Sequence, residues 1–183
     1  MSQPVIAVFG ASRAALGDGV YEQGVECGRL LAEAGYSVAT GGYGGLMEAV
    51  SQGAHLAGGH VVGVTAPGVF PDRSGANPFV AEEWPTTHLM ERIHEITRLS
   101  AAAITLPGSL GTLTELVAAW NLSYVARFSG GTPKPLITVG TQWAKIVADL
   151  AGILATDAAL VTCAPDVATA VAVIKERVTV DQV

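Results

Sequence analysis

The chain has 183 residues, and its composition excludes several classes of protein. Half of the residues are hydrophobic, 14% are charged and the formal net charge is −6, which argues against a nucleic-acid surface, because a phosphate backbone needs a basic stripe. The longest apolar runs are only as long as strands, so no membrane span is predicted. The first residues lack the basic start of a signal peptide, and we expect a cytoplasmic protein.

Short β-rich runs alternate with helical patterns along the chain. We predict strands at residues 5–9, 37–40, 60–65, 101–106, 135–139 and 159–163, with a further short strand at 79–81. We predict helices at residues 20–34, 46–57, 87–100, 112–128, 142–150 and 165–177. The strand runs are continuously apolar, which is typical of a parallel sheet covered on both faces. The sequence therefore predicts one α/β domain over residues 1–183, a Rossmann-like fold of about seven parallel strands with helices on both faces.

Three of the predicted strands run into glycine-rich turns, each followed by a helix. The turns are Gly-Ala-Ser at 10–12, Gly-Gly-Tyr-Gly-Gly at 41–45 and Pro-Gly-Ser-Leu-Gly-Thr at 107–112. A helix N-terminus offers unpaired N–H groups and a partial positive charge, so these turns can hold an anion without basic residues. The dinucleotide fingerprint with its acidic ribose ligand is missing, and so is the Walker Gly-Lys-Ser/Thr. The turns therefore predict a site for a monophosphate, or for one phosphate arm of a small ligand.

Two charged residues stand out in the predicted helices. Arg92 lies within an apolar stripe that includes Leu89 and Ile96, and a cation on a packing face usually has a buried carboxylate or a ligand phosphate as its partner. Its structural alternative is a snorkelling side chain. Glu115 completes a Thr112-x-x-Glu115 capping box, in which it would only cap the helix. Its place one turn after the third glycine turn also puts it near a ribose attached to the phosphate, and both interpretations stay open.

Taken in order and spacing, these residues resemble the lonely-guy family. The matching segments are Gly41-Gly-Tyr-Gly-Gly-Leu-Met47, Met90-Glu-Arg92 and Leu106-Pro-Gly-Ser-Leu-Gly-Thr-Leu-Thr-Glu115. The resemblance implies a cytokinin riboside 5'-monophosphate phosphoribohydrolase, with Arg92 and Glu115 as the catalytic pair and a nucleoside monophosphate, such as AMP or a cytokinin nucleotide, as the ligand. No metal and no cofactor are expected. The expected substrate-binding residues are Gly10, Ser12, Gly41, Gly42, Gly45, Met47, Glu82, Gly108, Ser109, Leu110, Gly111 and Thr112.

The chain departs from the family pattern at two positions near the expected ligand. Ser109 replaces the second glycine of the family's P-G-G-x-G-T loop, and Ile93 replaces the lysine that follows the arginine. These departures favour a second hypothesis, a non-catalytic carrier of a nucleotide or of the molybdenum cofactor, which the same superfamily contains. The presence of Arg92 and Glu115 favours the enzyme. A pyridoxal-dependent decarboxylase is rejected, because such an enzyme needs a Schiff-base lysine and no glycine-rich turn carries one.

The predicted helix at 112–128 is apolar on nearly every side. One stripe is expected to face the sheet and contains Leu113, Leu116, Val117, Trp120 and Tyr124; the opposite side carries Ala118, Leu122, Val125 and Ala126. A helix that covers a single sheet has nothing from its own chain to meet on its outer side. A partner subunit would cover that side, so the sequence predicts a homodimer.

Overall fold

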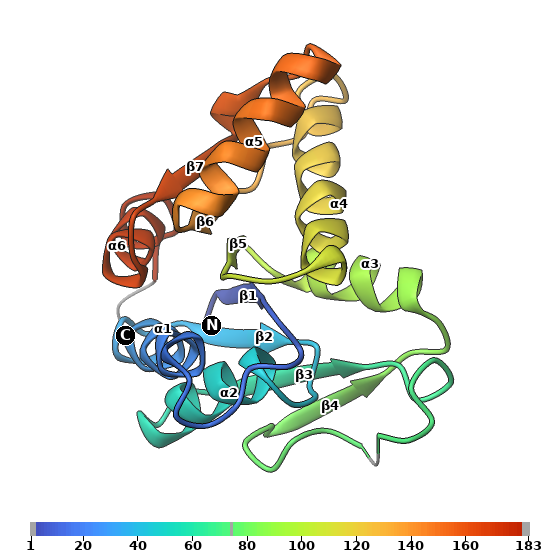
Figure 1. Ribbon diagram of the computed structural model, residues 1–183, viewed down its shortest axis with the longest axis vertical. Coiled ribbons are helices and arrows are strands. Elements are labelled where there is room, and N and C mark those ends of the chain that lie inside the picture. Colours follow the sequence, from blue (N-terminus) through green and yellow to red (C-terminus); the bar gives the residue numbers. More distant parts are fainter. Residues whose placement is uncertain (1–2, 74, 181–183) are drawn as a thin grey trace.

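The computed structural model describes residues 3–73 and 75–180 (Figure 1). Seven parallel strands form one sheet in the order β4-β3-β2-β1-β5-β6-β7. The strands are β1 Val5–Phe9, β2 Ser37–Thr40, β3 Val61–Thr65, β4 Glu82–Pro85, β5 Ala102–Thr105, β6 Leu136–Val139 and β7 Val161–Ala164. The helices are α1 Gly19–Glu33, α2 Leu46–Leu56, α3 Leu89–Leu99, α4 Leu110–Ala126, α5 Thr141–Leu154 and α6 Val167–Arg177, with the short 3-10 helix η1 at Ala158–Leu160. The predicted Rossmann-like α/β fold is confirmed.

Helices cover both faces of the sheet, as its apolar strands require. One apolar core joins the sheet to α1, α2 and α6, with Leu31, Val50 and Ile174 among its buried members. The other core joins the opposite face to α3, α4 and α5, and Trp143 and Leu116 are fully buried there. In Figure 1 the first group of helices lies at the lower left of the sheet and α4 and α5 lie above it. The central strands are therefore shielded from water on both sides.

The strand order reverses direction between β1 and β5, the two neighbouring strands at the centre of the sheet. Helix α1 follows β1 onto one face, whereas α4 follows β5 onto the other. The segments that follow β1 and β5 therefore leave the sheet toward opposite faces, and a crevice lies between the turns at the carboxyl ends of these two strands. In open α/β sheets this switch point is the usual place for a ligand.

Helices α1 and α2 approach each other more closely than side chains would normally allow. A β-carbon on Gly53 would overlap the carbonyl oxygen of Val25, and it would lie 2.7 Å from the carbonyl carbon of the same residue. A β-carbon on Gly28 would in turn overlap the carbonyl oxygen of Val50 and lie 2.8 Å from the amide nitrogen of Ala54. The two helices thus meet backbone against backbone at two glycines.

Some local expectations from the sequence were wrong. The strand expected at 79–81 lies instead at Glu82–Pro85, on the edge of the sheet beside β3. Helix α4 begins at Leu110, two residues earlier than expected. Val117, expected to face the sheet, is 41% exposed on the outer side of α4. For the edge strand, pairing with β3 rather than local pattern decides the outcome.

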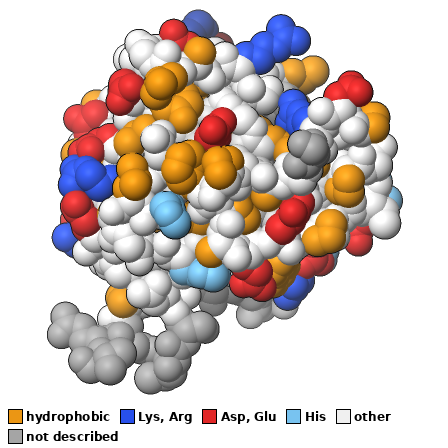
Figure 2. Space-filling view, turned by 90° about the horizontal axis from the view of Figure 1, so that it is seen from below, with side chains coloured by type: hydrophobic (Ala, Val, Ile, Leu, Met, Phe, Trp, Pro, Cys, Tyr) orange, Lys and Arg blue, Asp and Glu red, His pale blue; other side chains and the backbone are white. Residues whose placement is uncertain are grey.

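Charge on the surface agrees with the composition of the chain. Figure 2 views the molecule from below, and on this face hydrophobic, acidic and histidine side chains are interspersed while lysine and arginine occur singly. This face therefore has no continuous basic stripe. None of the described helices is both long and apolar enough to pass through a membrane.

Candidate active site

A cleft of about 170 Å³ opens at the carboxyl edge of the sheet, at the switch point between β1 and β5. Its walls come from the turns after β1, β2 and β5, from α3 and from the long loop between β3 and β4. The predicted site residues that line it are Gly10, Ser12, Gly41, Met47, Arg92, Ser109, Gly111, Thr112 and Glu115. Residues far apart in the sequence thus meet in one concave site.

Backbone hydrogen bonds fix the three glycine-rich turns relative to one another. The amide of Ala11 donates to the carbonyl of Pro107 at 3.1 Å, and the amide of Leu46 donates to the carbonyl of Ala11 at 2.8 Å. Gly45 has a φ of 72°, a left-handed conformation that glycine adopts without strain. A β-carbon there would lie 2.5 Å from the carbonyl carbon of Ser12, so the turns after β1 and β2 touch at this glycine.

Arg92 projects from α3 into the cleft and is buried, with 7% of its side chain exposed. Its Nε donates to the carbonyl oxygen of Val64 at 2.9 Å, and its Nη2 lies 3.4 Å from the sulfur of Met47. Its Nη1 lies 3.8 Å from Oε1 of Glu115. Burial lowers the pKa of Arg92, and the Glu115 charge opposes that effect. The guanidinium is therefore held in one orientation, by a backbone carbonyl and a thioether rather than by a close ion pair.

Glu115 lies one and a half turns into α4, with 12% of its side chain exposed. Burial raises its pKa to about 7, and the attraction of Arg92 only partly counteracts this. At 3.8 Å the pair is too long for a direct hydrogen bond, so the carboxyl group keeps its capacity to bind something else. A carboxyl group with a pKa near neutrality, in a cleft, is typical of a general acid or base.

The capping-box interpretation of Glu115 was wrong, because α4 begins earlier than the box requires. Ser109 is the N-cap residue, its side chain makes no capping hydrogen bond, and Thr112 already lies in the first turn. Thr112 is buried against Gly108, where a β-carbon would overlap its hydroxyl oxygen. Glu115 is thus directed into the cleft beside Arg92 instead of back to the helix start.

The remaining predicted residues lie outside the cleft lining. Gly42, Gly45 and Gly108 shape the turns behind it, and Leu110 is 76% exposed on the outer side of α4. Glu82 begins the edge strand β4 and accepts hydrogen bonds from the indole of Trp84 at 2.6 Å and the ring of His60 at 3.3 Å. The amino end of a strand points away from the carboxyl edge, so the structure does not bring Glu82 to the cleft.

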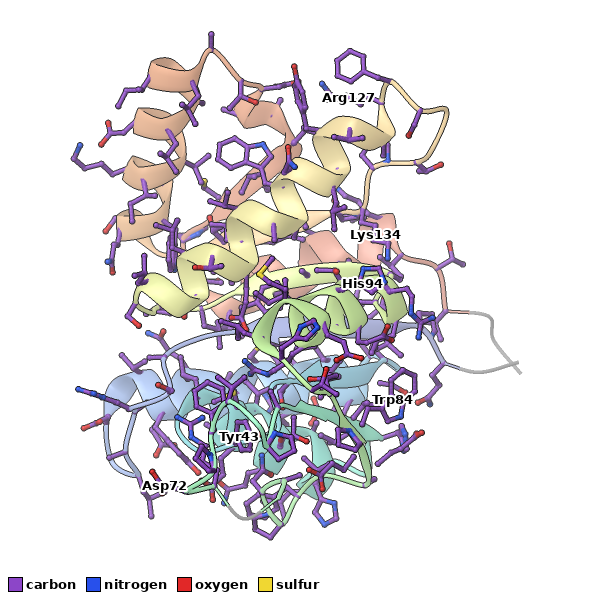
Figure 3. The ribbon with its side chains drawn as sticks, turned by 90° about the vertical axis from the view of Figure 1, so that its right-hand side faces the viewer. Tyr43, Asp72, Trp84, His94, Arg127 and Lys134 are labelled. Carbon is purple, nitrogen blue, oxygen red and sulfur yellow. The ribbon has the colours of Figure 1, made fainter. Side chains whose placement is uncertain are left out.

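Seven residues that line the cleft carried no prediction as ligand contacts. They are Val8, Phe9, Phe70, Arg73, Leu89, Ile93 and Thr114. Phe70 and Arg73 belong to the long loop at 67–78, whose length alone indicates a functional loop. In Figure 3, Tyr43 and Asp72 both lie below α3, in the lower half of the view. Asp72 is the neighbour of Arg73 in the sequence, so it marks the place of this loop.

Gly41 controls the position of Arg92, and replacing it by alanine should disturb the site without unfolding the protein. A β-carbon at Gly41 would overlap Nη2 of Arg92 and lie 2.6 Å from the sulfur of Met47. We expect Gly41→Ala to displace the guanidinium and to weaken the binding of a phosphorylated ligand such as AMP about 10- to 100-fold, as for a lost hydrogen bond to a charged group. Calorimetry measures the affinity, and thermal melting checks that the protein stays folded.

The matched control is Gly44→Ala in the same turn. A β-carbon there meets only the Glu48 carboxylate, at 3.7 Å, which is ordinary contact. Equal AMP affinity of the Gly41→Ala and Gly44→Ala proteins would contradict the role given to Arg92.

Comparison with known proteins places the chain among relatives of the expected kind. Against the cytokinin riboside 5'-monophosphate phosphoribohydrolase LOG of Oryza sativa subsp. japonica it is 39% identical over 94 residues, which cover 51% of this chain and 38% of that protein. Against the enzyme of the same activity name from Mycobacterium tuberculosis it is 34% identical over 119 residues, which cover 64% of this chain and 61% of that protein. The matches thus span about two fifths to three fifths of these relatives' lengths.

Solved structures resemble the chain over nearly its whole length. The molybdenum cofactor carrier protein of Chlamydomonas reinhardtii superposes with a TM-score of 0.77 and 26% identity, covering 95% of this chain and 97% of that one. The molybdenum cofactor binding protein of Rippkaea orientalis has a TM-score of 0.78 at 24% identity, which shows the fold. A family model described as the SLOG cluster4 family matches residues 3–130. The chain therefore belongs to the SLOG cluster4 family, within the lonely-guy superfamily that its motifs resemble.

Proposed function

We propose that the protein is a nucleoside 5'-monophosphate phosphoribohydrolase, which releases a free base and ribose 5-phosphate. The observation that carries the proposal is Glu115, a buried carboxyl group with a pKa near 7, beside Arg92 in a cleft bordered by glycine-rich turns. The named activity of the rice and mycobacterial relatives supports the same reaction.

The chemistry divides between the two charged residues. Water attacks C1' of the ribose, the bond from C1' to the base nitrogen breaks, and positive charge develops on the ribose as in glycoside hydrolysis. Ionised Glu115 stabilises that charge and accepts a proton from the water, the departing base takes up a proton from solvent, and Glu115 afterwards releases its proton to solvent. Arg92 holds the nucleotide, and the turns after β1, β2 and β5 position its phosphate through backbone N–H groups.

The second candidate function is a carrier that binds the molybdenum cofactor or a nucleotide without chemistry. The carrier proteins superpose on nearly the whole chain, whereas the enzymes match part of it. Ser109 in the turn and Ile93 beside Arg92 also favour this candidate. Both hypotheses expect a phosphate in the cleft, and they differ only in whether a bond breaks.

Base release distinguishes these two functions. The purified protein is incubated with AMP, GMP, CMP, UMP and a cytokinin riboside monophosphate, and chromatography detects free base. Release from at least one nucleotide, absent with Glu115→Gln, supports the hydrolase. Binding of these nucleotides with no release of base supports the carrier.

Phosphate recognition predicts that AMP stabilises the folded protein more than adenosine does. A ligand that binds only the folded state at 100 times its Kd adds about 2.7 kcal/mol, which corresponds to a rise in Tm of about 5–10 °C for a chain of this size. Adenosine lacks the phosphate that the turns would hold and should shift Tm little. Differential scanning fluorimetry with the two ligands at equal concentration measures both shifts, and equal shifts would contradict phosphate recognition.

We also propose a homodimer, because part of the outer face of α4 is not covered by the rest of the chain. Leu122 is 54% exposed, Val125 is 49% exposed and, on α3, Met90 is 62% exposed. A hollow of about 630 Å³ between these helices includes Met90 and Leu122 in its lining. We expect light scattering to give close to twice the 18.7 kDa of one chain.

A surface charge at the centre of this face should separate the subunits. We expect Leu122→Asp to give the mass of a monomer. The control is Leu56→Asp at the end of α2, where Leu56 is 71% exposed, and this variant should remain a dimer. A monomer mass for the unmodified protein would refute the interface.

A further inference from the structure

The long loop between β3 and β4 forms the outer wall of the cleft, and Asn77 ties this loop to the turn after β2. The amide of Asn77 donates to the carbonyl of Gly42 at 2.7 Å. Its side-chain Nδ2 donates to the carbonyls of Gly42 and Tyr43, each at 3.1 Å. The loop is thus anchored to one of the glycine-rich turns, so side chains that it carries have a defined place at the cleft.

Arg73 is the basic side chain that this loop brings to the cleft. Its guanidinium carbon lies 4.7 Å from the centre of the Tyr43 ring and 4.4 Å from the centre of the Phe70 ring. The two rings meet edge to face at 5.6 Å, and the Tyr43 hydroxyl accepts a hydrogen bond from the amide of Ala66 at 2.8 Å. Cation–π contact with two rings positions the guanidinium, and a guanidinium held in this way still has N–H groups that can donate hydrogen bonds.

The charge of Arg73 is not neutralised by an acidic neighbour in the part of the chain that the structure describes. Glu48 borders the hollow outside the cleft together with Arg73, and these two side chains form no ion pair among the described residues. Arg73 lines the cleft itself together with Arg92. The Tyr43 ring is their common neighbour, since the Arg92 guanidinium lies 5.9 Å from its centre. After burial, which is the main effect, the charge of Arg73 further lowers the pKa of Arg92.

Two cations therefore share a cleft in a protein whose formal net charge is −6. Like charges in one site repel each other unless an anion lies there. Glu115 only partly compensates the two positive charges, because burial raises the pKa of its carboxyl group and so favours the neutral form. The cleft thus favours a ligand with more than one negative charge, such as a phosphate monoester, which carries close to two charges at neutral pH.

We propose that Arg73 binds the phosphate of the ligand, with two N–H groups of its edge donating to two phosphate oxygens. This inference rests on the nucleoside monophosphate of the proposed function. It assigns to the β3–β4 loop the second cation that the family's lysine would supply from α3, where this chain has Ile93. Arg92 and Glu115 are then left to contact the ribose and the base, and Arg73 makes the site selective for phosphorylated ligands.

The experiment compares AMP and adenosine as ligands by isothermal titration calorimetry. All proteins carry Glu115→Gln, so that no AMP is consumed, and the test variant adds Arg73→Gln. The control adds Arg127→Gln, an identical loss of charge at the far end of α4 from Tyr43, where Arg127 pairs with Asp157 (Figure 3). We expect Arg73→Gln to weaken AMP binding roughly 10- to 100-fold, as expected for a lost hydrogen bond to a charged group. Adenosine binding should not change, and the control should bind both ligands like its parent.

The outcomes separate this inference from the proposed function. If Arg73→Gln leaves AMP affinity unchanged, or weakens AMP and adenosine equally, Arg73 does not bind the phosphate, whether or not the unmodified protein releases base. If AMP binding alone is weakened while the unmodified protein releases no base, the inference holds and the hydrolase is refuted. A parent protein that binds AMP and adenosine equally would overturn the inference as well.

Discussion

Replacing Glu115 by glutamine is expected to reduce base release by about 10³-fold or more while AMP remains bound. The substitution keeps the size of the side chain and removes only the charge, so the cleft and Arg92 remain in place. Loss of a carboxylate that stabilises the ribose and accepts the water proton costs about this much. Single-turnover assays measure the rate, and calorimetry measures AMP affinity. Turnover within a few-fold of the unmodified protein would show that Glu115 is not catalytic.

The free energy of unfolding of the same variant is a second readout, because the buried, ionised carboxylate of Glu115 opposes folding at high pH. The ordinary pKa of this carboxyl group is 4.5 and burial raises it to about 7. The neutral form is thus favoured in the folded protein, and its stabilising effect is fully present below pH 4.5 and is lost as pH rises through 7. The ionised group then costs about 3 kcal/mol, at 1.36 kcal/mol per pKa unit.

Glu115→Gln, which cannot ionise, is therefore expected to be more stable than the unmodified protein at pH 8 and equally stable near pH 4.5. Urea denaturation at both pH values checks the difference. Equal stability at pH 8 would show that Glu115 is not a buried carboxyl group with a raised pKa.

Gly53→Ala is expected to have the largest effect on stability, about 3 kcal/mol or more, because it forces two helices apart. The added carbon would overlap the backbone of Val25, and a backbone atom cannot move aside as a flexible side chain can. Insertion into a well-packed contact typically costs 1–3 kcal/mol, with higher values where the backbone must shift. The free energy of unfolding of a native protein is only about 5–15 kcal/mol in total. The variant should therefore melt far below the unmodified protein.

Gly152→Ala is the control for this change. Gly152 is exposed within α5, and a β-carbon there would meet nothing within 4 Å. Alanine has the better helix propensity, so this variant should gain up to about 1 kcal/mol. If both substitutions shift Tm in the same direction, the close approach of α1 and α2 does not limit stability.

The sequence predicted much of the fold because its strongest signals are local. The central strands are mostly apolar, so strands such as β1 and β5 could be found from local pattern alone. The glycine-rich turns marked the carboxyl edge, and Arg92 was identifiable because a charge interrupted an apolar stripe. These features depend on residues next to one another in the chain.

The errors arose where contacts between distant residues decide the structure. The edge strand β4 is exposed and contains Glu82, Glu83 and a proline, so only its pairing with β3 makes it a strand. Arg73 was not predicted as a ligand contact, because its place at the cleft depends on a loop that Asn77 anchors from 35 residues away.

Every side chain that lines the cleft comes from residues 8 to 115, within the 3–130 segment that matches the family model. Beyond residue 130 the chain contributes β6, α5, β7 and α6 to the two cores. Substitutions in the two parts of the chain should therefore have different effects on ligand preference. A library that diversifies residues 136–177 while keeping their apolar pattern should yield many folded proteins with unchanged ligand preference. A library that diversifies the loop after β3 should yield folded proteins with an altered ligand preference.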